Sequence, residues 1–385
     1  MIRNTEAVLA FVWILVWIIV ATLGYLITPD PTPNVNRQNL ELAMKPPGFT
    51  VNMLRVQSNV DLASQGFFRR IFFGKKLDYE TIPFDTVRFE GDNLILSRYT
   101  GLPGNLGAES HFNLADVVFS IDSVSAVNDS IGVLFLDGTT GQFDRDYLQQ
   151  SILENHIITR KYILGTDRFG RDILSQVIIG ARVSLSVGFI AIVIALFFGI
   201  ILGSLAGFFR GRTDDVIMWL INVVWSIPTL LLVIAITFAL GKGFWQVFIA
   251  VGLTMWVDVA RVVRGQIMSL RENEYIEAAK ALGLTDFRII RNHILPNITG
   301  PVIVISAANF ASAILIEAGL SFLGIGVQPP MPSWGSMIRD NYAFIILDMP
   351  YLAIIPGLCI MGLVMAFMLA GNGLRDALES SPYNY

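Results

Sequence analysis

Long uncharged stretches alternate with charged segments along most of this chain. Each has about the 20 residues that a helix needs to cross the hydrocarbon core of a membrane. One of them, 243–263, contains Asp258 and Arg261 near one end but has the same length. The other five are 7–29, 183–209, 216–241, 298–316 and 349–374. The pattern predicts an all-α polytopic membrane protein with six transmembrane helices.

The overall composition agrees with this pattern. Hydrophobic residues make up 54% of the chain and charged residues 15%, whereas soluble proteins average about 45–50% and 25%. A net charge of −4 without a long basic run gives no electrostatic basis for binding nucleic acid. With one Cys and three scattered His, we expect neither a disulfide framework nor a metal site.

The basic residues predict the orientation in the membrane. If the N-terminus is cytoplasmic, ten Lys and Arg residues fall in inner segments, and only Lys242 and Arg339 fall in short outer loops. The positive-inside rule then places both termini in the cytoplasm of a multi-pass protein of the plasma (inner) membrane. The first apolar stretch is too long for a signal-peptide core, so we expect it to remain as an anchor.

Three further patterns lie within the predicted spans. Asp258 and Arg261 are spaced for a local ion pair on one helix. Pro228 and Pro356 predict bends, which serve either as pivots or as static kinks. Small residues at every fourth position of the second span predict close helix contact. They are Gly199, Gly203 and Gly207.

The polar segment between the first two spans, 28–182, has a different pattern. A proline-rich linker, 28–33, opens it. Farther on, apolar and β-branched runs separated by turn residues predict strands, and a short helix is expected near 147–155. The predicted strands are 86–90, 94–97, 117–121 and 132–136. We therefore expect a small, mostly β extracytoplasmic domain inserted between membrane helices.

Residues 66–76 combine aromatic pairs with basic pairs. One interpretation is an amphipathic helix in the outer-leaflet interface. The other is a strand or helix of the small domain that uses its aromatic residues as core, and this is our expectation.

The basic loop between the fourth and fifth spans, 269–297, has a helix–glycine–helix pattern. Ser269 and Glu272 have the spacing of a capping box, and Asn273 is a second possible start. Gly283 is expected to end this first helix.

A second short helix is expected to begin at Thr285 and to stop at Pro296. The first helix would carry one apolar face of small residues, exposed for docking to a partner. The face consists of Tyr275, Ala278, Ala279 and Leu282.

This loop resembles the EAA loop of ABC importer permeases. Glu277-Ala278-Ala279, Gly283 and Ile294-Leu295-Pro296 stand at the spacing of that family. The resemblance implies that these positions couple the chain to an ATP-hydrolysing subunit. The candidate coupling residues are Glu277, Ala278, Ala279, Gly283, Leu295 and Pro296.

Other stretches resemble the dipeptide, oligopeptide and nickel permeases of the C type. They are the Leu-Gly-Thr-Asp motif at 164–172, then 180–185, 317–330 and 332–335. Glu317, which lies at membrane depth in one of them, is either a gate residue or the acceptor of a structural hydrogen bond.

The chain departs from this family in one region. Residues 42–48 resemble the segment that directly precedes the Leu-Gly-Thr-Asp motif, yet 49–162 intervene here. We expect 49–162 to be an insertion, about which the family's known functions say nothing.

The resemblance implies the transmembrane permease subunit of an ATP-driven peptide importer. Its expected partners are a homologous second permease, two ATP-binding cassette subunits, an extracytoplasmic substrate-binding protein and membrane lipid, but no nucleic acid. The chain has no Gly-x-x-x-x-Gly-Lys-Ser/Thr sequence, so ATP and Mg²⁺ would bind to partner subunits. We expect a transporter subunit that is not an enzyme and holds no cofactor.

Three alternatives remain. A nickel-type substrate fits the same family. An ion-coupled secondary transporter would need several charges within the membrane, and Asp258 and Glu317 are the two available. A membrane-anchored sensor would leave the EAA-like loop unexplained.

The expected domain order follows from these observations. Residues 1–28 form an N-terminal tail and the first span, 29–163 a linker and the inserted domain, and 164–182 the motif before the second span. The permease core, 183–376, contains the coupling loop, and 377–385 form a C-terminal tail.

Overall fold

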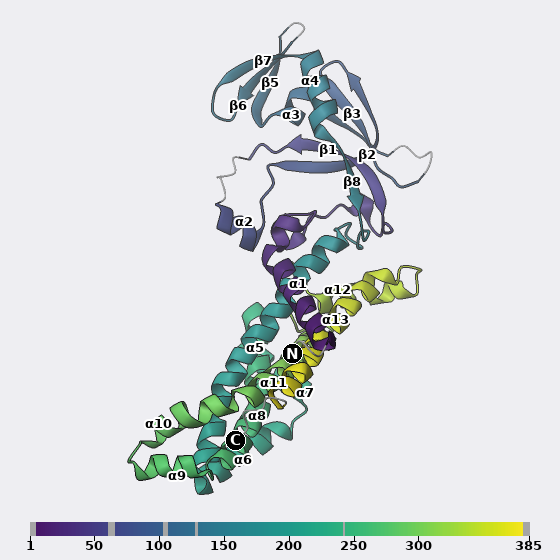
Figure 1. Ribbon diagram of the computed structural model, residues 1–385. Helices are drawn as coiled ribbons and strands as arrows, with labels where there is room; N and C mark the ends of the chain where they lie inside the picture. The colour runs from purple at the N-terminus through teal and green to yellow at the C-terminus, as the bar shows by residue number, and fades with distance from the viewer. Residues whose placement is uncertain (1–4, 61–65, 103–106, 128–129, 242, 380–385) are drawn as a thin grey trace. The chain divides into compact units, whose positions relative to one another are not determined.

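The computed structural model describes residues 5–60, 66–102, 107–127, 130–241 and 243–379. The chain divides into two compact units (Figure 1). We call Met1–Thr22 with Gly180–Tyr385 the helical unit, and Leu23–Ile179 the β unit. Helices α1 (Thr5–Ile27) and α5 (Ile173–Phe209) each begin in one unit and end in the other.

Helices build the whole of the helical unit. Besides most of α1 and α5, they are α6 (Gly211–Trp225), α7 (Thr229–Leu240), α8 (Phe244–Leu270), α9 (Glu274–Ala281), α10 (Asp286–Ile289), α11 (Thr299–Phe322), α12 (Trp334–Asn341) and α13 (Tyr351–Glu379). Five segments of the described chain are long and apolar enough to cross a membrane, and the bent pair α6–α7 would be a sixth. The prediction of a polytopic membrane protein with up to six spans is confirmed.

The third predicted span, 216–241, is not one straight helix. The axes of α6 and α7 differ by 93°, and the break lies at Ser226–Pro228. A proline disfavours helical geometry at the residue before it, and Pro228 itself has extended backbone angles. Pro356, by contrast, lies inside the continuous helix α13.

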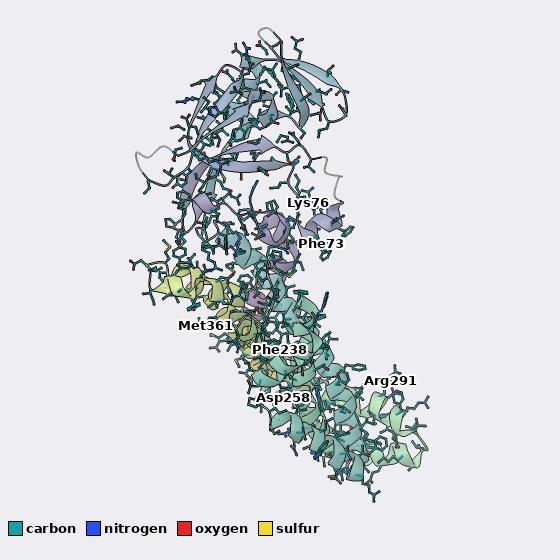
Figure 2. The ribbon with its side chains drawn as sticks, turned by 180° about the vertical axis from the view of Figure 1, so that it is seen from behind. Phe73, Lys76, Phe238, Asp258, Arg291 and Met361 are labelled. Atoms are coloured by element: carbon teal, nitrogen blue, oxygen red, sulfur yellow. The ribbon has the colours of Figure 1, made fainter. Side chains whose placement is uncertain are left out.

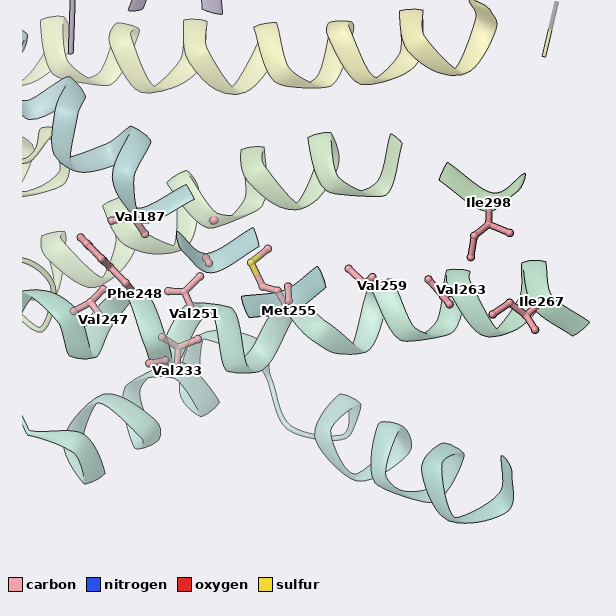
Figure 3. Close-up of a cluster of buried hydrophobic side chains, with 14 of the residues drawn as sticks. Val187, Val233, Val247, Phe248, Val251, Met255, Val259, Val263, Ile267 and Ile298 are labelled. Carbon is pink, nitrogen blue, oxygen red and sulfur yellow. The ribbon is translucent and has the colours of Figure 1, made fainter. Parts of the chain in front are cut away.

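Helix α8 is the centre of the apolar core. Its buried side chains face α5, α7 and α11, as Figure 3 shows for Val251, Met255 and Val259. The predicted glycine ridge of α5 packs on α8: a Cβ at Gly199 would lie 2.5 Å from Val259 Cβ, and one at Gly203 2.5 Å from the Ala260 carbonyl oxygen. Larger residues would push these two helices apart, so the packing interpretation of the ridge is confirmed.

Two antiparallel sheets form the β unit. The five-stranded sheet has the order β4-β3-β2-β1-β8 and the three-stranded sheet the order β5-β6-β7. The strands are β1 (Phe49–Gln57), β2 (Tyr79–Glu90), β3 (Asn93–Arg98), β4 (Glu109–Asn113), β5 (Ile121–Val127), β6 (Ser130–Phe135), β7 (Thr140–Asp144) and β8 (Ile157–Tyr162). Three short helices accompany them: α2 (Phe67–Phe73), α3 (Leu114–Val118) and α4 (Arg145–Ser151).

One apolar core joins both sheets to α3 and α4. Leu54, Leu96, Ile131 and Leu148 belong to it and are all almost completely buried. The prediction of a small β-rich domain is confirmed, and so are three of its four predicted strands, which lie in β2, β3 and β6. The helix expected near 147–155 is α4 with the π-turn Ile152–His156.

The strand predicted at 117–121 is wrong. Residues Leu114–Val118 form α3, and only Ile121 belongs to a strand. The Asn113 side chain accepts a hydrogen bond from the Ala115 backbone N–H at 3.0 Å and caps this helix. One turn of helix then buries Val117 completely, so local capping prevails over the strand preference of these residues.

Within residues 66–76, Phe67–Phe73 form the helix α2, but the expectation that its aromatic side chains are core is wrong. None of its residues is buried. The four phenylalanines are 63% (Phe67), 76% (Phe68), 59% (Phe72) and 68% (Phe73) exposed.

Candidate functional site

The coupling loop starts later than the capping-box spacing predicts. Helix α8 continues to Leu270, so Ser269 lies inside it and the predicted Ser269–Glu272 start is wrong. Helix α9 begins at Glu274, after an extended Asn273. The second predicted start is therefore the correct one.

Gly283 ends α9 as predicted. Its φ of +77° is in the left-handed region that favours glycine. The Gly283 N–H donates to the Lys280 carbonyl at 2.9 Å, and the Leu284 N–H donates to the Ala279 carbonyl at 3.2 Å. These two bonds form a Schellman motif, which reverses the chain sharply toward α10.

The predicted apolar face of α9 is divided between the core and the surface. Ile276 and Ala279 are buried against the core of the helical unit. Tyr275 is 43% exposed and Leu282 is 82% exposed, and Ala278 lies on the same open side. Ala279 therefore holds α9 in place and is not part of the exposed face.

The second helix of the loop is shorter than expected and does not stop at Pro296. After α10 the chain passes through the π-turn Ile290–Ile294 and the 3₁₀ turn Leu295–Ile298 directly into α11. Proline is compatible with the first positions of a helical turn because its missing N–H has no partner there. Leu295 packs on the core, whereas Pro296 is exposed.

Phe287 was missed by the sequence analysis. It is 72% exposed in α10. The sequence did contain a signal for it, because Phe287 is a large aromatic residue that stands between charged residues in a loop. We define the coupling surface as six exposed residues of α9, α10 and the turn between them: Tyr275, Glu277, Ala278, Leu282, Gly283 and Phe287.

Polar contacts tie the base of this loop to the ends of α5, α6 and α8. Arg264 of α8 binds both carboxylate oxygens of Asp214 in α6, at 2.5 and 2.6 Å. Arg210 donates to Glu272 at 2.7 Å and to the Met268 carbonyl at 3.2 Å.

A second set of contacts meets at Phe208, near the end of α5. Arg271 donates to its carbonyl oxygen, and the Lys280 ammonium of α9 lies 5.1 Å from the centre of its ring. These contacts connect α9 and the chain just before it to α5, α6 and α8.

Glu317 lies completely buried in α11. Its carboxyl accepts hydrogen bonds from Ser321 at 2.7 Å and from Ser184 of α5 at 3.4 Å, and Ser333 also bonds to it. Ser321 in turn accepts the Val327 backbone N–H at 3.3 Å. The carboxyl thus joins α5 and α11 to the loop that leads into α12.

Asp258 lines a cavity of about 260 Å³ beside the break between α6 and α7. Thr229, Thr254 and Ser312 supply further polar lining. The predicted Asp258–Arg261 ion pair is wrong: Asp258 accepts the Trp225 indole N–H at 3.3 Å, and the Arg261 guanidinium stacks 3.5 Å from the centre of that indole. A large aromatic side chain lies between the two charges.

The Leu-Gly-Thr-Asp motif forms a compact turn in the β unit. Asp167 accepts backbone N–H bonds from Phe169 and Arg171, both at 2.9 Å, and a side-chain bond from Arg171 at 2.7 Å. The Asp172 carboxylate accepts hydrogen bonds from the backbone N–H and the hydroxyl of Ser175. Burial raises the pKa of this carboxyl, and the bonds from Ser175 only partly oppose that rise.

The segment before β1 packs directly on this motif. Lys45 N–H donates to the Thr166 hydroxyl at 2.8 Å, and Met44 N–H donates to the Asp167 carbonyl at 3.0 Å. The first residue of β1, Phe49, pairs with the last residue of β8, Tyr162. The two ends of 49–162 therefore lie side by side.

Comparison with known proteins identifies the class. Residues 199–382 match the family described as binding-protein-dependent transport system inner membrane component. The dipeptide transport system permease of Alkalihalophilus pseudofirmus is 45% identical over 215 residues, which are 56% of this chain and 70% of that protein. This chain belongs to the family of binding-protein-dependent ABC importer permeases.

Further relatives belong to peptide transport systems. The glutathione transport system permease of Pectobacterium atrosepticum is 38% identical over 62% of this chain and 76% of the relative. The oligopeptide transport system permease of Bacillus subtilis is 38% identical over 57% of this chain and 72% of the relative. These relatives are thus permeases of peptide transport systems.

Proposed function

We propose that this chain moves di- or oligopeptides across the plasma (inner) membrane as one of two homologous permeases in an ATP-driven importer. Two ATP-binding cassette subunits bind ATP and Mg²⁺, and an extracytoplasmic binding protein delivers the peptide. Both termini are cytoplasmic. The observation that carries this proposal is the coupling surface: an exposed apolar corner on a rigid base, at the residues where the resemblance places the ATPase contact.

In this proposal the coupling surface docks into the ATPase subunit. Leu282 and Phe287 are the apolar anchors, because large exposed side chains at a sharp corner can enter a groove and lose all contact with water. Glu277 adds a charge at the edge. Ala278 permits close approach, while Ala279 and Leu295 hold the helices from behind.

Closure of the ATPase subunits would then move α9 and α10 as a body. The Arg264–Asp214 pair and the contacts at Phe208 pass this movement to α5, α6 and α8. The break at Pro228 lets α6 and α7 reorient separately, and the Asp258 cavity lies beside it. Such rigid-body motion of packed helices produces alternating access.

Peptide is the substrate favoured by the relatives, whose names specify dipeptides, glutathione and oligopeptides. A nickel-type substrate remains the alternative within the family. Among the described residues no group of three or more His, Cys, Asp or Glu is placed to hold a metal ion.

Ion-coupled transport is the alternative from another class. It requires carboxylates that bind and release ions within the membrane. Glu317 is fully buried among three serine hydroxyls, an arrangement that supports a structural role and a part in closing the outer side, the gate function we assign to it.

We also propose that 49–162 is an extracytoplasmic insertion that contacts the binding protein. The adjacent ends, Phe49 and Tyr162, support this, because a domain with neighbouring ends can be added to a loop at little cost in closure entropy. Its own core and two sheets support independent folding.

Co-purification of ATP-binding cassette subunits with the tagged chain tests the proposal. Gly283→Trp should abolish co-purification, because it strains the turn and adds bulk to the docking corner. Gly138→Trp is the matched control: its φ of +81° and open surroundings equal those of Gly283, but it lies in a β hairpin.

The control variant should bind the ATPase subunits like the wild type. If neither wild type nor control recovers them, or if Gly283→Trp binds them equally well, the assignment of the coupling surface is wrong.

A further inference from the structure

Helix α2 is the most apolar exposed element of the β unit that no function yet explains. Four phenylalanines in seven residues are each more than half exposed, and none of the helix is buried. Phe67 and Phe68 contact each other edge to face at 5.9 Å between ring centres. A short helix with this much exposed aromatic surface requires a covering environment.

The helix separates aromatic from basic residues. With 100° between successive residues, Phe67, Ile71, Phe68 and Phe72 fall within one arc of about 140°. Arg69 and Arg70 lie outside this arc, with Phe73 between them. Beyond Gly74 come Lys75 and Lys76, and none of the four basic side chains has an ion pair with a described carboxylate. Aromatic residues on one side and unpaired cations on the other fit a boundary between acyl chains and phosphate groups.

Contacts at its end place α2 next to the membrane helix α1. The Lys75 N–H donates to the Pro31 carbonyl at 2.7 Å. A Cβ on Gly74 would lie 2.7 Å from the same oxygen and 3.0 Å from Cε1 of Tyr25, which belongs to the last turns of α1. The Tyr25 hydroxyl accepts the Asn34 N–H at 3.0 Å.

These contacts lie within the β unit and fix α2 beside the last turns of α1. Phe73 and Lys76 are labelled at this end of the helix in Figure 2.

We propose that α2 lies in the membrane interface beside the end of α1 and binds anionic phospholipid. Its phenylalanines enter the upper acyl-chain region, while Arg69, Arg70, Lys75 and Lys76 contact lipid phosphates. The helix holds the base of the β unit against the bilayer. This site needs α1 as a membrane span but does not depend on the substrate or the ATPase partners.

Spin labelling of the full chain tests this placement. The single cysteine is first removed (Cys359→Ser), and Phe68→Cys is labelled with a nitroxide in nanodiscs of phosphatidylcholine and phosphatidylglycerol. The label should lie about 5–10 Å below the headgroups, with high accessibility to oxygen and low accessibility to a water-soluble nickel chelate. The matched control is Leu136→Cys in the β6–β7 turn, 44% exposed, which should show the reverse.

Two outcomes would overturn the proposal. If the label at Phe68 is as accessible to the nickel chelate as the label at Leu136, α2 lies in water. If it is shielded from oxygen and nickel alike, a protein surface covers α2, and its partner is a second copy or another subunit.

Charge reversal tests the lipid chemistry. Arg69→Glu with Arg70→Glu should move the Phe68 label toward water in nanodiscs that contain phosphatidylglycerol, because like charges repel. In phosphatidylcholine alone the same double variant should cause a smaller shift. Equal shifts in both lipids would refute the binding of anionic headgroups.

Discussion

Two short helices, α9 and α2, expose large apolar side chains, but they are attached to the molecule in opposite ways. Helix α9 buries Ile276 and Ala279 in the core, and its Lys280 lies over the ring of Phe208, while Glu272 just before the helix pairs with Arg210. Helix α2 buries no residue, and contacts at its end, through Gly74 and Lys75, attach it to the rest of the β unit.

The difference suggests two kinds of contact. A rigidly seated surface can transmit force to the helices beneath it, as coupling to an ATPase requires. A surface that buries no residue in a core can adapt to a fluid boundary but transmits little. We therefore assign docking to α9 with α10 and lipid contact to α2.

Charged substitutions should separate the two surfaces most strongly. Leu282→Asp with Phe287→Asp should lower ATPase affinity by at least about tenfold per site, since the anchor residues of an interface typically contribute about 2 kcal/mol or more each and about 1.4 kcal/mol is tenfold. Phe68→Asp with Phe72→Asp on α2 should leave that affinity unchanged. Titration of the purified ATPase subunits onto each variant in nanodiscs measures both values, and equal losses would remove the distinction.

The helical unit should be sensitive to loss of the partly buried ion pair that joins α6 to α8, next to the coupling loop. Arg264→Gln leaves Asp214 without its bidentate partner and should lower the free energy of unfolding by about 2 kcal/mol. The matched change in the β unit is Arg88→Gln, which breaks an exposed pair with Glu109 at 3.0 Å and should cost less than about 1 kcal/mol.

Thermal unfolding in detergent, together with ATPase stimulation, compares these two variants. A smaller effect at Arg264 than at Arg88 would contradict the rigid base.

Deletion of 49–162, with Gly48 joined to Ile163, removes α2 and both sheets together. The helical unit should still insert and bind ATPase subunits, because its core contains no residue of this segment. Stimulation of ATP hydrolysis by the binding protein should fall several-fold. Pull-down and ATPase assays test this, and a deleted chain that fails to assemble would show that the segment belongs to the permease core.

Asp258→Asn should have the smallest effect. The amide oxygen can still accept the Trp225 indole N–H, so stability should change by less than about 1 kcal/mol. Peptide uptake should persist, because ATP and not an ion gradient drives it. Complete loss of uptake with normal ATPase assembly would instead favour ion coupling through this carboxylate.

Periodicity and turn chemistry predicted most of the helical unit, because membrane helices must satisfy their own backbone hydrogen bonds and so require long uncharged runs. The end of α9 at Gly283 could be predicted because glycine readily adopts the left-handed conformation that ends a helix. The break at Pro228 was foreseen as a bend, but its 93° angle depends on packing against α8 and α11 that no local pattern contains.

Local patterns failed where a competing contact decided the outcome. The cap at Asn113 turned a strand-like run into α3, and a continuing α8 absorbed the apparent start at Ser269. For α2 the pattern itself was informative, since aromatic and basic pairs suggested either core or interface. The exposure of its four phenylalanines excludes the core. The contacts at Gly74 and Lys75 with Pro31 and Tyr25, which are distant in sequence, place α2 beside α1.

Uptake of a labelled dipeptide and hydrolysis of ATP, measured in the same proteoliposomes with binding protein present, test the central claim most directly. The assembled wild-type chain should show uptake that requires ATP and rises with its hydrolysis, and Gly283→Trp should abolish both while Gly138→Trp retains both. Uptake that continues without ATP, or that survives Gly283→Trp, would contradict coupling through α9 and α10.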